Sequence, residues 1–215
     1  MGGVVARKRP ATGGPGRPAR PRTGSLPEAA LTEGTRLTYD EYCRTPETNL
    51  KRELYFGVVK EGAAFARHQL AVVQLVVACE LFNRAHLRGV VGVAPTDVVL
   101  DRDRALVLQP DVFVVGPDRL GLVGQKLQGA PDLAIEVTSP SRRRYDRVLK
   151  HAVYRDYGVR EFWVVDPAAR SIEVISWLGD ARDEVRERYH DGDTARSRLW
   201  PELAVPVIEV WGPFG

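Results

Sequence analysis

Short apolar runs alternate along this chain with two helix-length segments, and this order restricts the fold more than any other feature. Strand-like runs fall at 53–60, 89–93, 97–100, 105–109, 111–115, 132–138, 160–165 and 171–177. Apolar residues at helical spacing mark one helix at 66–85. A second helix is predicted to begin at Ser139 and Pro140 and to end at Gly158. We therefore expect one α/β (α+β) domain in which a central sheet is flanked by helices.

Local signals refine this order at four places. Thr38, followed by two acids within the next three residues, predicts a short N-capped helix. The Asp-Arg-Asp-Arg segment at 101–104 predicts a hairpin turn, and the run 132–138 is expected to be a central strand. From about residue 180 the chain is polar and then apolar again, so this end is expected to hold few strands.

The helix predicted at 66–85 has a wide apolar face. Its members are spaced three or four residues apart: Leu70, Val73, Val77 and Leu81, widened by Val72, Val76 and Cys79. We expect this face to be buried, and two kinds of burial remain open. One is simple core packing, and the other is the interface of a homodimer.

The first 30 residues differ in composition from the rest of the chain. Residues 1–27 carry six basic side chains, five prolines and six glycines but no acid, and they have no hydrophobic periodicity. We expect residues 1–30 to be a disordered basic tail and residues 31–215 to form the single domain. The tail is interpreted as a solvated extension or as an electrostatic arm for nucleic acid. Because the whole chain has a net charge of +3, the body is slightly acidic.

Several protein classes are disfavoured by the sequence. No stretch of about 18 uncharged apolar residues occurs, so no membrane-spanning helix is expected. The two cysteines cannot form a disulfide scaffold, which fits a cytoplasmic location. Phosphate-binding glycine loops and a nucleophile-elbow motif are missing from the sequence, and no organic cofactor is expected.

Two acids at strand positions are the strongest candidates for chemistry. Glu136 lies inside an apolar run, where an acid is costly to bury unless it is paired or binds a metal. Strand alternation places it on the face opposite Ile135 and Val137, beside the small Ala134. Asp111 begins another strand. The structural alternatives are an arginine partner for Glu136 and an ordinary Pro-Asp turn for Asp111.

A lysine and three arginines in the second helix are further candidates. Lys150 is one of only five lysines beside 26 arginines, and burial can tune the pKa of a lysine. Its alternative role is a surface ion pair with Asp146, four residues earlier. Arg142, Arg143 and Arg144 lie in the first helical turn, where cations oppose the helix dipole. They could contact a phosphate backbone or simply be solvated.

These residues resemble a known family. The strings P-D-V-F-V-V, G-A-P-D-L-A-I-E-V-T-S-P-S and R-R-R-Y-D-R-V-L-K-H-A-V-Y-R-D-Y-G-V-R-E-F-W-V-V-D-P occur in the order and spacing of the Uma-two putative restriction endonuclease family. That family belongs to the restriction-endonuclease-like, PD-(D/E)xK superfamily. The resemblance covers about residues 36–178, and upstream R-E-L-Y-F-G-V-V-K resembles the family's E-x-x-x-G segment.

The resemblance implies a role for each candidate residue. Asp111 and Glu136 would be metal ligands with catalytic roles, and Glu53 would be an outer metal ligand. Thr138 stands where the superfamily usually has its lysine, which implies that Lys150 supplies the catalytic ammonium. His68 would be an additional site residue.

The activity that the resemblance implies is hydrolysis of DNA phosphodiester bonds by a metal-dependent endonuclease. Oxygen ligands favour Mg²⁺ or Mn²⁺ as the cofactor. Two carboxylates about 4 Å apart repel by about 4 kcal/mol at an effective dielectric near 20, and a divalent cation removes that repulsion. Two alternatives stay open: a non-catalytic binding or assembly module on the same fold, and a hydrolase of small phosphate esters.

Overall fold

A mixed six-stranded sheet forms the centre of the protein in this computed structural model, which describes residues 31–62, 65–139, 145–179 and 183–212. The strand order is β11-β10-β9-β8-β6-β3, in which only β8 and β9 run parallel. The six strands are β3 (Val90–Val93), β6 (Val112–Val115), β8 (Leu133–Val137), β9 (Glu161–Asp166), β10 (Ser171–Ser176) and β11 (Val185–His190).

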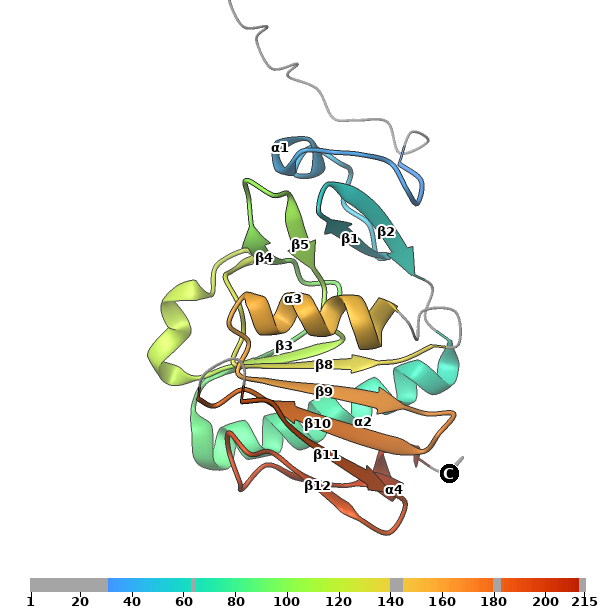
Figure 1. Ribbon diagram of the computed structural model, residues 1–215, viewed down its shortest axis with the longest axis vertical. Coiled ribbons are helices and arrows are strands. Elements are labelled where there is room, and N and C mark those ends of the chain that lie inside the picture. Colours follow the sequence, from blue (N-terminus) through green and yellow to red (C-terminus); the bar gives the residue numbers. More distant parts are fainter. Residues whose placement is uncertain (1–30, 63–64, 140–144, 180–182, 213–215) are drawn as a thin grey trace, which may run out of the picture.

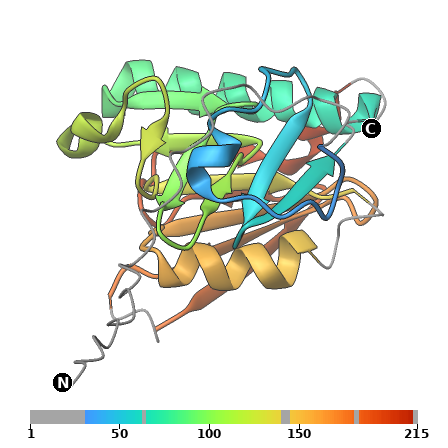
Figure 2. The same ribbon diagram turned by 90° about the horizontal axis from the view of Figure 1, so that it is seen from above.

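Two helical segments cover opposite faces of this sheet (Figures 1 and 2). One is α2 (Ala66–Phe82), which continues into the π-helical turn η2 (Asn83–Leu87). The other is α3 (His151–Asp156), which follows the π-helical turn η4 (Tyr145–Lys150). The sheet flanked by helices is therefore confirmed.

A second sheet lies beside the central one, with strand order β2-β1-β5-β4-β7. Its strands are β1 (Lys51–Tyr55), β2 (Val58–Gly62), β4 (Val98–Asp101), β5 (Leu106–Leu108) and β7 (Leu127–Gln128). The remaining elements are the helix α1 (Tyr39–Tyr42), the 3₁₀-helix η3 (Pro117–Leu122), the small sheet of β12 (Thr194–Arg196) and β13 (Ala204–Pro206), and the helix α4 (Val207–Val210). The hairpin β4–β5 turns at 102–105, one residue later than predicted, and Thr38 caps α1 as predicted.

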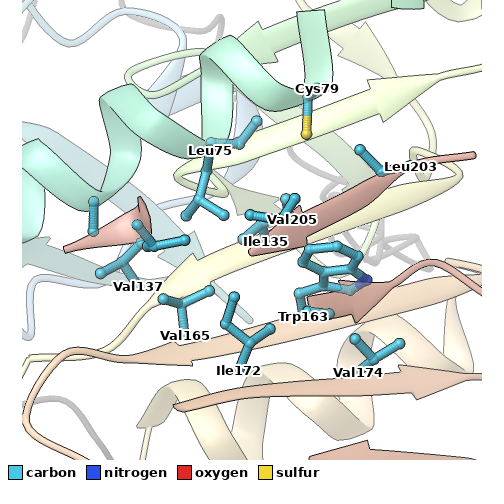
Figure 3. Packing of buried hydrophobic residues seen from close by; sticks show 14 of the residues in the cluster. Leu75, Cys79, Ile135, Val137, Trp163, Val165, Ile172, Val174, Leu203 and Val205 are labelled. Carbon is cyan, nitrogen blue, oxygen red and sulfur yellow. The ribbon is translucent and has the colours of Figure 1, made fainter. Parts of the chain in front are cut away.

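Strand β8 separates the two sides of the molecule by simple alternation. Leu133, Ile135 and Val137 pack in the cluster that includes α2, as Figure 3 shows for Ile135 and Val137. Ala134, on the other face, packs in the cluster that includes α3. The predicted alternation is thus confirmed, and it directs Glu136 toward the α3 side.

The hairpin of β1 and β2 corrects the prediction of one strand at 53–60. Phe56 and Gly57 have φ of 47° and 79°, which reverses the chain between the two strands. Two successive residues in the left-handed region make a two-residue hairpin turn. The apolar alternation continues across this turn, so hydrophobicity alone does not show where the strand ends.

The buried face of α2 also differs from the prediction. Its buried residues are Ala71, Leu75, Cys79 and Phe82. Val73, Val77 and Leu81 of the predicted face are 53%, 48% and 64% exposed, whereas Cys79 is buried and Val72 and Val76 pack against the core as predicted. The helix is apolar on several sides, so the spacing of its apolar residues does not decide which side meets the sheet.

The C-terminal region contains more regular structure than predicted. Strand β11 extends the central sheet by pairing with β10 from Ser171 to Ser176. β11 is an edge strand of charged and mostly exposed residues, so it lacks the apolar pattern that marks the interior strands. The short strands β12 and β13 and the helix α4 follow it.

By length and composition alone, the helical stretch Ala66–Leu87 is apolar enough to cross a membrane. Such a single helix is weak grounds for a membrane protein, because core helices of soluble proteins pass the same test. In this chain the stretch covers the sheet with one side.

Candidate active site

Asp111 and Glu136 lie side by side at neighbouring strand ends. β6 and β8 pair so that Val112 is opposite Ile135, and continuing this antiparallel register by one residue places Asp111 opposite Glu136. Both side chains are buried, at 3% and 1% exposure. Two acids from positions 25 residues apart are therefore brought together by strand pairing.

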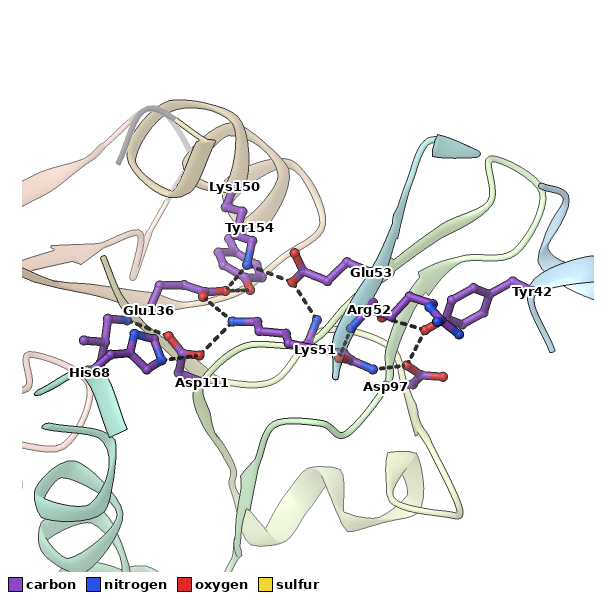
Figure 4. A network of polar contacts seen from close by, with 12 residues as sticks. Tyr42, Lys51, Arg52, Glu53, His68, Asp97, Asp111, Glu136, Lys150 and Tyr154 are labelled. Atoms are coloured by element: carbon purple, nitrogen blue, oxygen red, sulfur yellow. Dashed lines mark hydrogen bonds and ion pairs between the residues drawn. The ribbon is translucent and has the colours of Figure 1, made fainter. Parts of the chain in front are cut away.

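Each of these carboxylates has one oxygen anchored by the protein. Asp111 Oδ2 accepts a hydrogen bond from the backbone N–H of Val137 at 2.8 Å. Glu136 Oε1 accepts from Lys150 Nζ at 2.7 Å and from the Tyr154 hydroxyl at 2.7 Å. The other oxygens, Asp111 Oδ1 and Glu136 Oε2, face a common point (Figure 4).

The ammonium of Lys51 occupies that common point. Its Nζ lies 2.7 Å from Asp111 Oδ1 and 3.0 Å from Glu136 Oε2. Lys51 is the first residue of β1, and its side chain is 19% exposed. Because it bridges two carboxylates from β6 and β8, it links the second sheet to the central one.

Lys150 bridges a second pair of acids deeper in the protein. Its Nζ lies 2.8 Å from Glu53 Oε1 and 2.7 Å from Glu136 Oε1, and its side chain is 1% exposed. Glu53 Oε1 also accepts from the backbone N–H of Gln109 at 2.9 Å. Lys150 is therefore a buried residue rather than a surface one, and the side chain of Asp146, its alternative partner, lies outside the part of the chain that the structure describes.

His68 and Tyr154 complete the polar cluster. His68 Nε2, near the start of α2, lies 3.4 Å from Asp111 Oδ1. Tyr154 is fully buried one helical turn after Lys150, with its ring against Phe162. The structure thus brings five of the predicted site residues into one cluster: Glu53, His68, Asp111, Glu136 and Lys150. The other candidates, Arg142, Arg143 and Arg144, lie outside the described residues.

Nearby cations lower the pKa values of two acids of the cluster, Asp111 and Glu53. Burial alone would raise the pKa of Asp111, but the Lys51 ammonium and His68 lower it well below its usual range. Burial would also raise the pKa of Glu53, but Lys150 and Lys51 lower it. The pKa of Lys51 is raised, because attraction to Asp111 and Glu136 outweighs the effect of burial.

A pocket gives access to this cluster from solvent. It has a volume of about 320 Å³ and is lined by Lys51, His68, Asp111, Glu136 and Lys150, among others. A neighbouring cleft of about 500 Å³ shares Asn49 and Pro95 with it. The pocket and the cleft therefore adjoin each other.

The donor set fits a hard divalent cation only in part. Asp111 Oδ1 and Glu136 Oε2 converge on one cation position, and Mg²⁺ binds through one or two carboxylates plus water. Glu53 is turned toward Lys150 rather than toward that position. Within the described part of the chain, no three His, Cys, Asp or Glu side chains gather as a metal-binding group.

Lys51 and Tyr154 are the members of the cluster that sequence reasoning missed. Lys51 precedes Glu53 by two residues, so both lie on one face of β1. Tyr154 follows Lys150 by four residues and shares its helical face. Both spacings can be read from the sequence. Only the packing of β1 and the helix against β8 shows that these residues meet Glu136.

The mixed sheet between helices, with two carboxylates at neighbouring strand ends and a buried lysine from the helical segment beside them, has a restriction-endonuclease-like fold. A solved structure, a putative nuclease belonging to DUF820 from Anabaena variabilis ATCC 29413, has the same fold with a TM-score of 0.69 and 16% identity. The match covers 81% of this chain and 97% of that chain.

The family model of Uma2, described as "Putative restriction endonuclease", matches residues 39–207. The chain therefore belongs to the Uma2 family, as the resemblance predicted. A search of curated proteins found no match.

Proposed function

We propose that this protein is a metal-dependent endonuclease that hydrolyses DNA phosphodiester bonds. The observation that carries the proposal is the pair of anchored carboxylates, Asp111 and Glu136, whose remaining oxygens converge on one cation position beside an open pocket. Family membership supports a nuclease, since the Uma2 description is that of a restriction endonuclease.

Asp111 Oδ1 and Glu136 Oε2 would hold Mg²⁺ or Mn²⁺. When bound, such an ion supplies charge that polarises a phosphate and activates a water molecule. Val137 orients the Asp111 carboxylate, and Lys150 with Tyr154 orients that of Glu136. Lys150 acts as a positioning residue, because its ammonium is buried between two acids.

The neighbouring cleft favours a polymer over a small phosphate ester as substrate. The active-site pocket and the cleft share Asn49 and Pro95, so a strand whose phosphate enters the pocket has an adjacent groove for the next nucleotide. Lys126 lines this cleft and carries a cation suited to a phosphate backbone. A small ester would leave the cleft unused.

The test is cleavage of plasmid and single-stranded DNA with Mg²⁺ or Mn²⁺. We expect nicking by wild type and a loss of at least 100-fold in Asp111→Asn and Glu136→Gln. Glu173→Gln is the matched control, because it changes a buried acid of the same sheet outside the pocket. Inactivity of pure wild type on every DNA form would favour the binding module, and activity on nucleotide esters alone would favour the small-ester hydrolase.

We also propose that the protein is a homodimer, which would suit cleavage of both strands of a duplex. Val73, Val77 and Leu81 form an exposed stripe at four-residue spacing on α2, and such a stripe can pair with its own copy across a two-fold axis. We expect Val77→Asp to be monomeric by light scattering. Val185→Asp, a comparable exposed valine on β11, should leave the mass unchanged.

A further inference from the structure

The cation position between Asp111 and Glu136 is filled by a group of the protein itself. Lys51 Nζ lies within 3.0 Å of one oxygen of each acid, and both oxygens face the pocket. Oxygen ligands bind Mg²⁺ at about 2.0–2.1 Å, so an ion bridging these two oxygens would overlap the ammonium. The lysine and the ion therefore exclude each other at this point.

The two lysines of the site differ in their freedom to move. Lys150 is 1% exposed, and its ammonium is held between two buried acids, Glu53 and Glu136. Lys51 is 19% exposed, lines the pocket and carries its charge on a flexible four-carbon stem. Lys51 is thus the cation that can leave while Lys150 stays.

We propose that Lys51 is a tethered counter-cation that competes with the divalent metal for Asp111 and Glu136 and must swing into the pocket before the metal binds. The inference rests on the proposed metal-dependent function. Its consequence is that the metal-free protein keeps its two buried acids neutralised. The affinity for the metal is lower than it would be without Lys51, because part of the metal-binding free energy is used to displace the ammonium.

The direct test is Mn²⁺ binding, measured from the electron paramagnetic resonance signal of the free ion. Lys51→Met keeps an apolar stem of similar length and removes the charge. We expect it to bind Mn²⁺ at least tenfold more tightly than wild type, with binding still lost in Asp111→Asn. Lys126→Met is the matched control, because that lysine pairs with Asp97 in the neighbouring cleft, and its affinity should equal that of wild type.

The outcomes separate this inference from the proposed function. Asp111-dependent binding by wild type that is equal or weaker in folded Lys51→Met overturns the role of Lys51 alone. Binding by neither protein overturns the metal site, and the inference with it. If Lys126→Met bound Mn²⁺ as tightly as Lys51→Met, the gain in affinity would come from the change in overall charge. That result would also overturn the inference.

A second measurement uses wild type and so does not depend on the folding of a variant. The chain has five lysines, so ¹³Cε-lysine labelling gives few signals, and Lys51→Arg assigns the one of interest. We expect Mg²⁺ to move the Lys51 signal toward that of a solvated lysine while the Lys126 signal stays in place. A Lys51 signal that does not move at saturating Mg²⁺ would overturn the proposal.

Discussion

Lys150 donates a hydrogen bond to Glu136 Oε1 at 2.7 Å, although 14 residues separate the two in the chain. Both side chains are 1% exposed, and the contact joins η4 to strand β8. The pair therefore couples the orientation of a candidate metal ligand to the packing of a helical segment on the sheet.

Replacing Lys150 should destabilise the protein strongly. Lys150→Met leaves Glu53 and Glu136 buried without their shared cation, and breaking a buried ion pair costs about 3–5 kcal/mol. Urea unfolding measures the loss in the free energy of unfolding. Lys126→Met, which breaks a pair whose lysine is 30% exposed, should cost at most about 1 kcal/mol. Similar losses in the two variants would contradict the buried bridge.

Removing the hydroxyl of Tyr154 should have a smaller effect. Tyr154→Phe keeps the ring against Phe162 but removes the hydrogen bond to the Glu136 carboxylate, which is worth about 1.5–3 kcal/mol. Thermal and urea unfolding would detect this loss in the free energy of unfolding. Tyr157→Phe, whose hydroxyl bonds Asp101 nearer the surface, serves as control and should cost less. A neutral Tyr154→Phe would show that Glu136 does not need this donor.

Acid should weaken the folded state in part through Asp111. Its pKa is lowered on folding, so the unfolded chain takes up a proton first, near the ordinary value of about 3.9. The stabilisation is complete above about pH 5 and declines as pH falls toward the lower folded pKa. In metal-free buffer, the melting temperature of Asp111→Asn should fall less steeply than that of wild type between pH 5 and pH 3. If the melting temperatures of the two proteins fell in parallel with pH, Asp111 would make no such contribution to stability.

Gly89 should not tolerate a side chain, for reasons of space alone. A Cβ there would lie 2.1 Å from the carbonyl oxygen of Val115, and a backbone atom in a paired strand cannot move aside easily. We expect Gly89→Ala to lower the free energy of unfolding by about 1–3 kcal/mol or more, as is typical of overpacking. At Gly121 a Cβ meets nothing within 4 Å, so Gly121→Ala is the control and should be near neutral in urea unfolding.

Much of the candidate site follows from local rules. Alternation in β8 placed Glu136 away from Ile135, and its burial among apolar neighbours marked it as an acid in need of a partner. The short strands and the helix ending at Gly158, whose φ is 86°, also follow from local pattern and backbone preference. These features depend on residues close in the chain, so the sequence by itself determines them.

Only the tertiary structure decided which partners these residues meet. The side of α2 that faces the sheet was predicted only in part, because several sides of that helix are apolar and packing chooses among them. Lys51 reaches Asp111 and Glu136 over separations of 60 and 85 residues. Those contacts depend on how strands from two sheets lie together, and the free energy that sets this arrangement is spread over the whole core rather than stored in any local segment.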